Sequence, residues 1–444
     1  MRSIALALLL SSAAVAQEAG HESAATPAPA PAAPEDAVPE ASGADGYTPA
    51  DSNAAQPPLR LTGYVDFGFA RAQGNGTSFR AGDQRIPADY GVDTFAPAVN
   101  SRGDVASTDS GGNFTNGFLP RSVGIGGRAS FLLNTVDVDV RYAPTTVPLF
   151  LFTRLQVLPR FNATGESTTV LVEQAFARLI PFSTQEFALT VGKFDSVFGI
   201  EYLENEANLR TGITPSLIAR YTTGQSLGVK AFYRVQIPKL WTGISLNLAA
   251  TNSGNMVESL QPPSVSLTGT PVFSARLGFE WNLTRVEAKI GVSAMDGPRN
   301  DQSQPGVRQK AIAADARLLL YGFELRAERI ILTQDEGAGD KENGLGLQTL
   351  VSGFQVRGAY VQLGYGFNVD SASLKRVTLY GRYGQRHAQF EGFTPITVDR
   401  ITAGLRVDLW DALALKGEYL WNRELSGAPQ VPNDVLTSSL VYTW

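Results

Sequence analysis

The chain has 444 residues, of which 43% are hydrophobic and 18% charged, and its formal net charge is -5. It contains no cysteine, which excludes a disulfide scaffold, a lipid-modified cysteine and a thiolate metal site. Beyond the N-terminal segment no apolar run reaches the length of about 18 residues that a transmembrane helix needs.

The first 58 residues divide into two segments that we do not expect to form a folded core. Residues 1–16 have the features of a secretory signal: a positive charge at Arg2, an apolar core over residues 4–10 and a small-residue cleavage site at 14–16. Residues 17–58 are rich in Ala and Pro and carry no Lys or Arg, so they predict a disordered periplasmic linker. Its acids are Glu18, Glu22, Glu35, Asp36, Glu40, Asp45 and Asp51.

From residue 59 to residue 444, segments of about ten residues alternate between apolar and polar positions, which is the period of β-strands. In the first segment Leu61, Val65 and Phe67 share one face, whereas Arg60 and Asp66 share the other. Since a bilayer accepts strands only in a closed barrel, this region predicts an all-β, transmembrane, antiparallel up-and-down β-barrel. A secreted soluble β-sandwich is the alternative, because it also has alternating strands.

The predicted connections also alternate in length, as do the periplasmic turns and outer loops of outer-membrane barrels. The two sets of connections give about 16 strands with both termini in the periplasm. Residues 136–142 are taken as the end of the second strand, and counting them separately favours 18 strands instead. Short links are expected near 143–146, 181–185, 237–240, 283–284, 321, 368–373 and 410–411, and long links near 72–120, 159–168, 196–225, 253–271, 296–308, 334–352, 387–396 and 425–433.

The aromatic residues support a membrane location. The last strand ends on Leu440, Tyr442 and Trp444, which share one face, and a terminal aromatic residue is typical of outer-membrane barrels. Four of the five tryptophans (Trp241, Trp281, Trp410 and Trp444) are expected at periplasmic strand ends, where aromatic rings form an interfacial girdle.

Three segments carry a family resemblance. Residues 173–176, 191–201 (VGKFDSVFGIE) and 225–229 resemble the phosphate-selective porin family and related Gram-negative outer-membrane porins. The resemblance extends over residues 59–444 and implies a homotrimer of 16-stranded channels with loops folded inward, one of which sets the pore width. The arginine ladder and lysine cluster of true phosphate channels have no residue-by-residue match in this sequence.

The candidate functional residues are charges of the third outer loop and of the barrel wall. Basic side chains outnumber acidic ones on the inward strand faces, which predicts a weak anion preference that arises from the wall potential. Many of these charges are also expected to pair across strands, as Arg326 with Glu324 or Glu328, and only to solvate the lumen. The pore-lining candidates are Arg210, Arg220, Glu201, Glu204 and Glu206 in the third loop, which we expect to face water, and Arg128, Arg382, Arg400 and Arg406 on the wall; the first loop, 72–120, is the other candidate constriction.

The sequence offers little catalytic chemistry. Its two histidines are His21, in the linker, and His387, in an expected outer loop, and neither accompanies a recognisable nucleophile. We therefore expect no catalytic residue, no cofactor, no metal site and no nucleic-acid partner. The prediction is an outer-membrane porin that contacts lipid and passes small hydrophilic solutes; a channel specific for phosphate or another small anion, and a structural or adhesive barrel, are the alternatives.

Overall fold

The structure is a computed structural model that describes residues 58–72, 129–144, 146–162, 165–182, 186–195, 197–204, 206–222, 224–237, 242–252, 269–283, 286–298, 308–335, 354–369, 371–390, 395–426 and 434–444. The expected signal segment 1–16 lies outside these residues, as do the linker up to residue 57 and most of the first loop.

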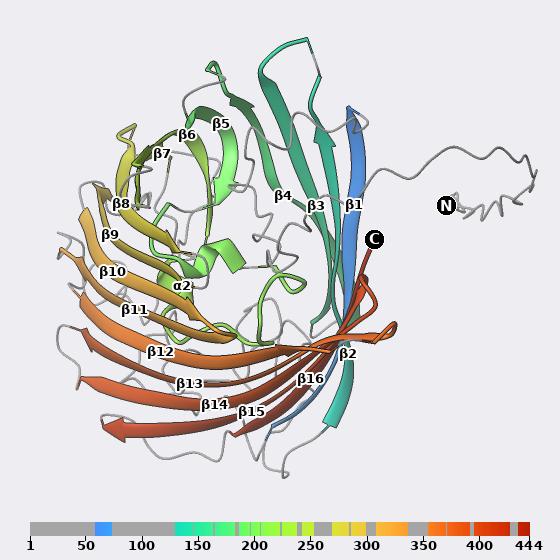
Figure 1. Ribbon diagram of the computed structural model, residues 1–444. Coiled ribbons are helices and arrows are strands. Elements are labelled where there is room, and N and C mark those ends of the chain that lie inside the picture. Colours follow the sequence, from blue (N-terminus) through green and yellow to red (C-terminus); the bar gives the residue numbers. More distant parts are fainter. Residues whose placement is uncertain are drawn as a thin grey trace, which may run out of the picture. The chain divides into compact units, whose positions relative to one another are not determined.

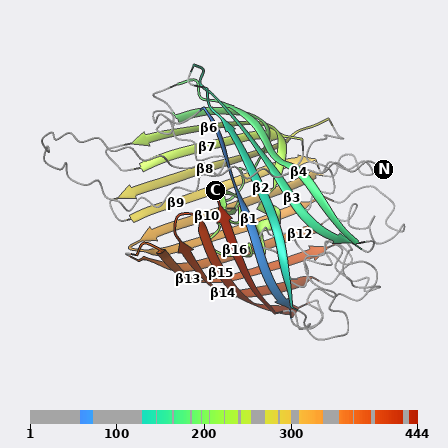
Figure 2. The same cartoon turned by 90° about the vertical axis from the view of Figure 1, so that its right-hand side faces the viewer.

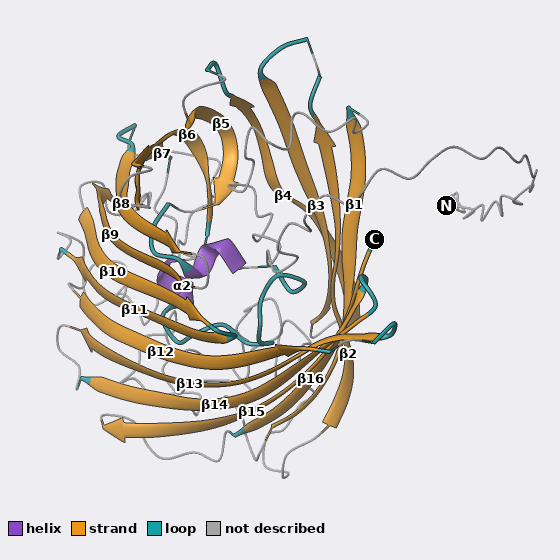
Figure 3. Ribbon diagram, viewed as in Figure 1, coloured by secondary structure: helices purple, strands orange, loops and turns teal. Residues whose placement is uncertain are grey.

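The described part of the chain forms one closed sheet of 16 antiparallel strands, each paired with its neighbours in sequence (Figures 1 and 3). The count of 16 is therefore confirmed, and residues 136–142 are the end of the second strand. The strands are β1 (Leu59–Ala72), β2 (Ala129–Tyr142), β3 (Leu149–Asn162), β4 (Gly165–Leu179), β5 (Glu186–Asp195), β6 (Gln225–Ile237), β7 (Thr242–Thr251), β8 (Val272–Leu283), β9 (Val286–Pro298), β10 (Arg308–Leu320), β11 (Phe323–Gln334), β12 (Phe354–Asn368), β13 (Leu374–Phe390), β14 (Ile396–Leu409), β15 (Leu413–Ser426) and β16 (Val435–Thr443).

The first and last strands close the barrel. β1 lies between β16 and β2, and Figure 2 shows the three strands side by side. Val65 pairs with Tyr442, and the Gly63 amide donates to the Trp444 carbonyl at 3.1 Å. Closure removes the sheet edges, so every strand has hydrogen-bonding neighbours on both sides.

The connections follow the predicted order of short turns and long loops, with two corrections. β3 and β4 extend to residues 162 and 165, so the link expected at 159–168 is much shorter than predicted. β13 runs to Phe390, so His387 is a strand residue, whose Nδ1 lies 2.8 Å from Thr397 Oγ1, and not a loop residue. In both cases strand pairing continues through polar residues that alternation alone does not identify as strand.

The two faces of the wall differ in polarity, as the alternation predicted. Along β12, Val361 and Leu363 are 49% and 54% exposed, whereas Tyr360 and Gln362, which alternate with them, are buried. β1 likewise exposes apolar residues and buries polar ones: Leu61 is 65% exposed and Asp66 is fully buried. A soluble sandwich would bury its apolar face, so a closed barrel with an apolar exterior excludes that alternative.

Aromatic side chains gather at the ends of strands that meet in the short turns. Tyr321 and Trp410 occupy turns with positive φ angles of 49° and 50° and are 64% and 54% exposed. Phe323 and Tyr365 are in ring contact at 4.5 Å, and Trp444 is 42% exposed. This arrangement fits an interfacial girdle. Trp241 lies outside the described residues. Among the described helices, none has the length and apolar character of a membrane span.

Candidate functional site

Among the connections that the structure describes, one long connection lies inside the ring of strands. Residues 197–224 between β5 and β6, called the inner loop below, include the short helices η2 (Glu201–Glu204) and α2 (Ala219–Thr222). Figures 1 and 3 show this segment, with α2, surrounded by the strands of the wall. It is the loop that the sequence identified as the third outer loop.

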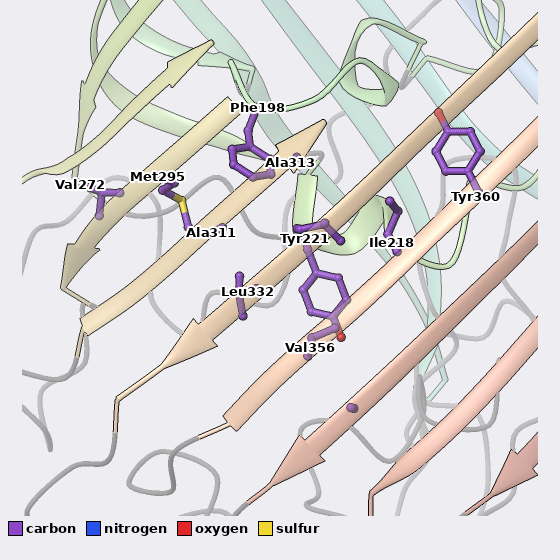
Figure 4. Packing of buried hydrophobic residues seen from close by; sticks show 12 residues of the cluster. Phe198, Ile218, Tyr221, Val272, Met295, Ala311, Ala313, Leu332, Val356 and Tyr360 are labelled. Carbon is purple, nitrogen blue, oxygen red and sulfur yellow. The ribbon is translucent and has the colours of Figure 1, made fainter. Parts of the chain in front are cut away.

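Apolar side chains attach the inner loop to the wall on one side of the barrel. Phe198, Ile218 and Tyr221 of the loop are 0–2% exposed and belong to a cluster with wall residues of β8 to β13. Figure 4 shows Tyr221 near Leu332 and Val356, and Ile218 on the side of Tyr360. Inward positions in this part of the wall are therefore apolar where the loop packs against them, unlike most of the polar lumen.

Two smaller clusters attach the loop elsewhere on the wall. Val197 is fully buried and packs with phenylalanines of β3, β4 and β5, including Phe152 and Phe176. Ala207 packs with Tyr64 of β1 and Ala414 of β15. Burying an apolar side chain contributes roughly 1.5–3 kcal/mol for a valine-sized or larger group, so these contacts hold the loop at three places around the barrel.

A glycine is needed where the loop leaves β5. Gly199 has a φ angle of 76°, and its amide donates to Ser293 Oγ of β9 at 3.1 Å. A Cβ atom at this position would lie 1.9 Å from Glu328 Oε1 of β11. The backbone angle favours glycine here, and a Cβ would in addition displace the Glu328 carboxylate.

Glu418 of β15 and Arg382 of β13 bind the tip of the inner loop, residues 213–215. Glu418 accepts hydrogen bonds from the backbone amides of the tip, and Arg382 donates to its carbonyls. The Glu418 carboxylate accepts hydrogen bonds from the amides of Ile213 and Thr214 at 2.8 and 2.9 Å and from Thr214 Oγ1 at 2.8 Å, and Tyr380 also donates to it. The Arg382 guanidinium donates to the carbonyls of Thr214 and Pro215, both at 2.9 Å. The loop backbone is thus satisfied by charged wall groups, and such hydrogen bonds are stronger than neutral ones.

Two further cations hold the segment before this tip. Lys416 Nζ of β15 donates to the carbonyls of Ala207, Arg210 and Gly212. Arg406 of β14 donates to the Arg210 carbonyl at 2.8 Å and is paired with Asp408 at 2.8 Å. Both cations therefore hold the loop by donating hydrogen bonds to its backbone carbonyls.

The acids of the inner loop contact different strands. Glu204 is ion-paired with Arg326 of β11, which also contacts Glu324 at 2.5 Å. Glu324 and Arg326 lie on the same strand, so this pair forms along β11 and not across strands as expected; the cross-strand partner of Glu324 is Arg317 of β10 at 2.7 Å. Glu206 accepts a hydrogen bond from Tyr64 of β1 at 2.7 Å and is ion-paired with Arg154 of β3. Glu201 remains within the loop, where it accepts from the Ser216 amide at 2.6 Å.

Arg210 corrects the expectation of a water-facing loop charge. Its side chain is buried, with Nη1 donating to the Ile213 carbonyl at 2.8 Å and Nε to the Glu204 carbonyl at 3.2 Å. Burial lowers the pKa of the guanidinium, and the carboxylate of Glu201 opposes this shift. An arginine pKa begins so far above neutrality that the group keeps its charge. Arg210 therefore organises the loop.

The other predicted site residues divide into three groups. Glu201, Glu204, Glu206, Arg382 and Arg406 come together around the inner loop, as described above. Arg400 lies on the wall, 4% exposed, and donates to Asn422 Oδ1 at 2.8 Å. Arg128 lies outside the described residues, and Arg220 falls in α2, with its side chain outside the described part.

Sequence reasoning missed several residues of this site on β2, β3 and β4. Asp137 and Asp139 are buried, and Arg154 binds Asp139 at 2.6 and 2.8 Å. The alternation of valine and aspartate over residues 136–140 is a signal that could have placed both acids on the inward face. No such signal exists for Glu173, because a bulge interrupts the alternation of β4 there.

The charges on the described wall fall into two regions. On β5 to β11 basic and acidic groups pair with each other, as in Arg234 with Glu280 at 3.3 Å and Arg317 with Glu324 at 2.7 Å. On β13 to β15 the basic Arg and Lys side chains that are buried or half-buried are Arg376, Arg382, Arg386, Arg400, Arg406 and Lys416, and the acidic ones in the described part are Asp399, Asp408 and Glu418. The second region is the more positive of the two.

Comparison with known proteins gives likenesses of structure and none of sequence. No protein-family model matches the chain, and a search of curated proteins finds no relative. The outer-membrane channel DcaP of Acinetobacter baumannii superposes with a TM-score of 0.48 at 12% identity, over 87% of this chain and 97% of that one. An anion-selective porin from Comamonas acidovorans gives 0.48 at 10% identity, over 87% and 99%. OmpT of Vibrio cholerae gives 0.46 at 9% identity, over 87% and 97%. Values this low assign neither a family nor a function.

Proposed function

We propose that this chain is an outer-membrane porin through which small hydrophilic solutes diffuse, without catalysis and with a weak preference for anions. The observation that carries the proposal is the inner loop, which is held inside a closed barrel by polar and charged wall residues, among them Tyr64, Arg154, Arg326, Arg382, Arg406, Lys416 and Glu418. A loop fixed in this way narrows the lumen without blocking it. The width of the lumen and the charges that line it set the selectivity of passive diffusion.

The outward face supports the membrane location. Large apolar side chains are exposed on β1, β8, β10, β12, β13 and β16, for example Phe273 at 59% and Ile312 at 58%. Surfaces of this kind are stable against lipid, and in water they would promote aggregation. A trimeric assembly remains a prediction from the family resemblance.

The positive region on β13 to β15 supports the anion preference. Its basic groups are held by the fold whether or not a solute is present, so their potential acts on every ion that passes. The contribution of partly solvated groups should fade at high salt, because the screening length falls from about 10 Å at 0.1 M to about 3 Å at 1 M ionic strength.

Reversal potentials in planar bilayers test this proposal. A KCl gradient across the wild-type channel should give a potential of anion-selective sign, which Arg400→Gln should reduce. Arg308→Gln is the matched control, because Arg308 is half exposed at the outer end of β10 and pairs with Asp296 at 2.8 Å. A cation-selective wild type, or equal effects of the two variants, would contradict the assignment.

The same recordings separate the alternatives. Block of the chloride current by low concentrations of phosphate would favour a channel with a specific anion site, which the clustered basic residues of β13 to β15 also fit. A folded barrel that shows no conductance would favour the structural or adhesive barrel.

A further inference from the structure

Three buried carboxylates from distant parts of the sequence converge at one point of the lumen. Asp137 of β2, Glu173 of β4 and Glu206 of the inner loop each place an oxygen within 4.8 Å of the other two. The three residues are 0%, 3% and 5% exposed. Bringing like charges together away from water is unfavourable unless protons or a cation offset them.

A break in the strand register turns one of these acids toward the lumen. Between β3 and β4 the pairing steps from Arg154 opposite Gln174 to Leu155 opposite Val172, which makes Glu173 the extra residue of a β-bulge. Glu173 and Gln174 are consequently both buried, although consecutive strand residues normally point to opposite faces. Bulges often re-aim a side chain in this way next to functional sites.

The positive charge near the three acids is shared with a fourth. Arg154 is ion-paired with Glu206 and also forms a two-pronged contact with Asp139 at 2.6 and 2.8 Å. The contacts of the other acids include neutral donors: Thr135 Oγ1 lies 2.8 Å from Asp137, and the Gln225 amide lies 3.2 Å from Glu173. Arg141 is a second cation near Asp139, at 3.8 Å. Among the described residues these two arginines face four carboxylates, so negative charge remains at the convergence point.

The side chain of Gln156 provides an independent indication of a missing ligand. Gln156 of β3 is fully buried, and its Nε2 lies 3.4 Å from Asp137 Oδ2 and 3.1 Å from Glu173 Oε2. Its Oε1 has no hydrogen-bond partner among the described residues, which is a costly state for a buried carbonyl. A half-turn of the amide exchanges the two atoms and directs the oxygen between the acids. That orientation is favourable when a cation lies there, or when one of the acids carries a proton that it donates to the oxygen.

We propose that Asp137, Glu173, Glu206 and Gln156 form a Ca²⁺ site that joins the inner loop to the barrel wall. The donor set is all oxygen, which suits a hard cation. Oxygens bound to Ca²⁺ at about 2.3–2.6 Å lie at most about 5 Å apart, and the measured limit of 4.8 Å fits one ion between them. Mg²⁺ fits less well, because it requires regular octahedral geometry and keeps several waters.

The ion would link the inner loop to the barrel wall. Asp137, Glu173 and Gln156 belong to the wall, whereas Glu206 belongs to the inner loop, so Ca²⁺ binding and loop docking stabilise each other. This inference does not depend on the solute that passes the barrel.

Calorimetric titration of CaCl2 into the chain, refolded in detergent free of lipopolysaccharide and treated with EDTA, tests the site. We expect one Ca²⁺ per chain, a rise in thermal unfolding temperature with CaCl2 and a weaker response to MgCl2. Asp137→Asn should weaken Ca²⁺ binding by about tenfold or more, because it removes a charged ligand. Gln156→Glu should strengthen it by a similar factor while destabilising the EDTA-treated protein, because it adds a fourth carboxylate.

Glu280→Gln is the matched control, since Glu280 is a lumen acid of β8 that pairs with Arg234 and Lys289 and does not belong to the cluster. Its Ca²⁺ response should equal that of the wild type. The proposal is overturned if the wild type neither binds Ca²⁺ nor gains thermal stability from it, or if folded Asp137→Asn responds like the wild type. If Asp137→Asn does not fold, Gln156→Glu decides: unchanged Ca²⁺ affinity would show that the acids share protons instead of a cation.

Discussion

Replacing Glu418 with alanine should release the tip of the inner loop without unfolding the barrel. Glu418 is 2% exposed and binds the amides of Ile213 and Thr214 through its carboxylate. Alanine leaves both amides without an acceptor and leaves Tyr380 without the group to which it donates. The strand ladder of β15 uses backbone groups, so it remains intact.

The size of the effect follows from the two orphaned amides. A buried donor that loses its partner costs about 1–3 kcal/mol, so the two together cost roughly 2–6 kcal/mol. Water that enters the lumen will offset part of this cost. Taking the low end, a loss of about 2 kcal/mol shifts the equilibrium between docked and released loop by about thirtyfold, since about 1.4 kcal/mol corresponds to a factor of ten.

Hydrogen exchange measured by mass spectrometry on peptides from the inner loop gives a direct readout. Amides of the loop should exchange about thirtyfold faster in Glu418→Ala, whereas peptides from β12 and β13 should not change. Single-channel recordings should show increased open-channel noise. Glu418→Gln should lie between Glu418→Ala and the wild type, because its amide keeps one acceptor oxygen.

Glu280→Ala serves as the control, because its pairs with Arg234 and Lys289 lie within the wall. Loop exchange in that variant should match the wild type. Equal exchange in Glu418→Ala and Glu280→Ala would refute the view that wall carboxylates hold the loop, and the apolar contacts of Phe198 and Ile218 would then account for its position.

Three further outcomes are expected. Deleting residues 442–444 removes the pairing of Tyr64 with Thr443 and should prevent closure, so the truncated chain should lose the faster gel migration of unheated barrels; normal migration would contradict the role of β16. Deleting residues 17–57 should leave insertion and heat-dependent migration unchanged, because the first strand of the barrel begins at Leu59, and loss of folding would make the segment part of the barrel. Gly404→Ala places a Cβ 2.2 Å from the Tyr380 ring and should lower stability in urea titrations by about 1–3 kcal/mol, with an unchanged midpoint as the contrary result.

The sequence alone was sufficient for the barrel, because the signals that specify it are local. A two-residue period identifies the strands and their faces, so Leu61 and Asp66 were assigned correctly to the outside and the lumen. The alternation of turn and loop lengths gave 16 strands. The ends of strands were predicted less accurately where a strand continues through residues that do not alternate in polarity, as β13 does at His387.

The inner loop could be located in the sequence, but its contacts could not. Arg210 is hydrophilic and lies in a loop, and by local rules it should face water. It is buried because barrel closure surrounds the loop with wall groups such as Arg406 and Lys416, which come from strands almost two hundred residues or more away. Neither alternation nor composition carries information about contacts of that range.

The convergence of Asp137, Glu173 and Glu206 shows the same division. The pattern of residues 136–140 places Asp137 on the inward face, so this part was determined by the sequence. Glu173 faces inward because pairing with β3 produces a bulge, and Glu206 reaches the wall because the loop folds across the lumen. Both depend on which strands are neighbours in the closed sheet, and strand pairing and loop docking are properties of the tertiary structure.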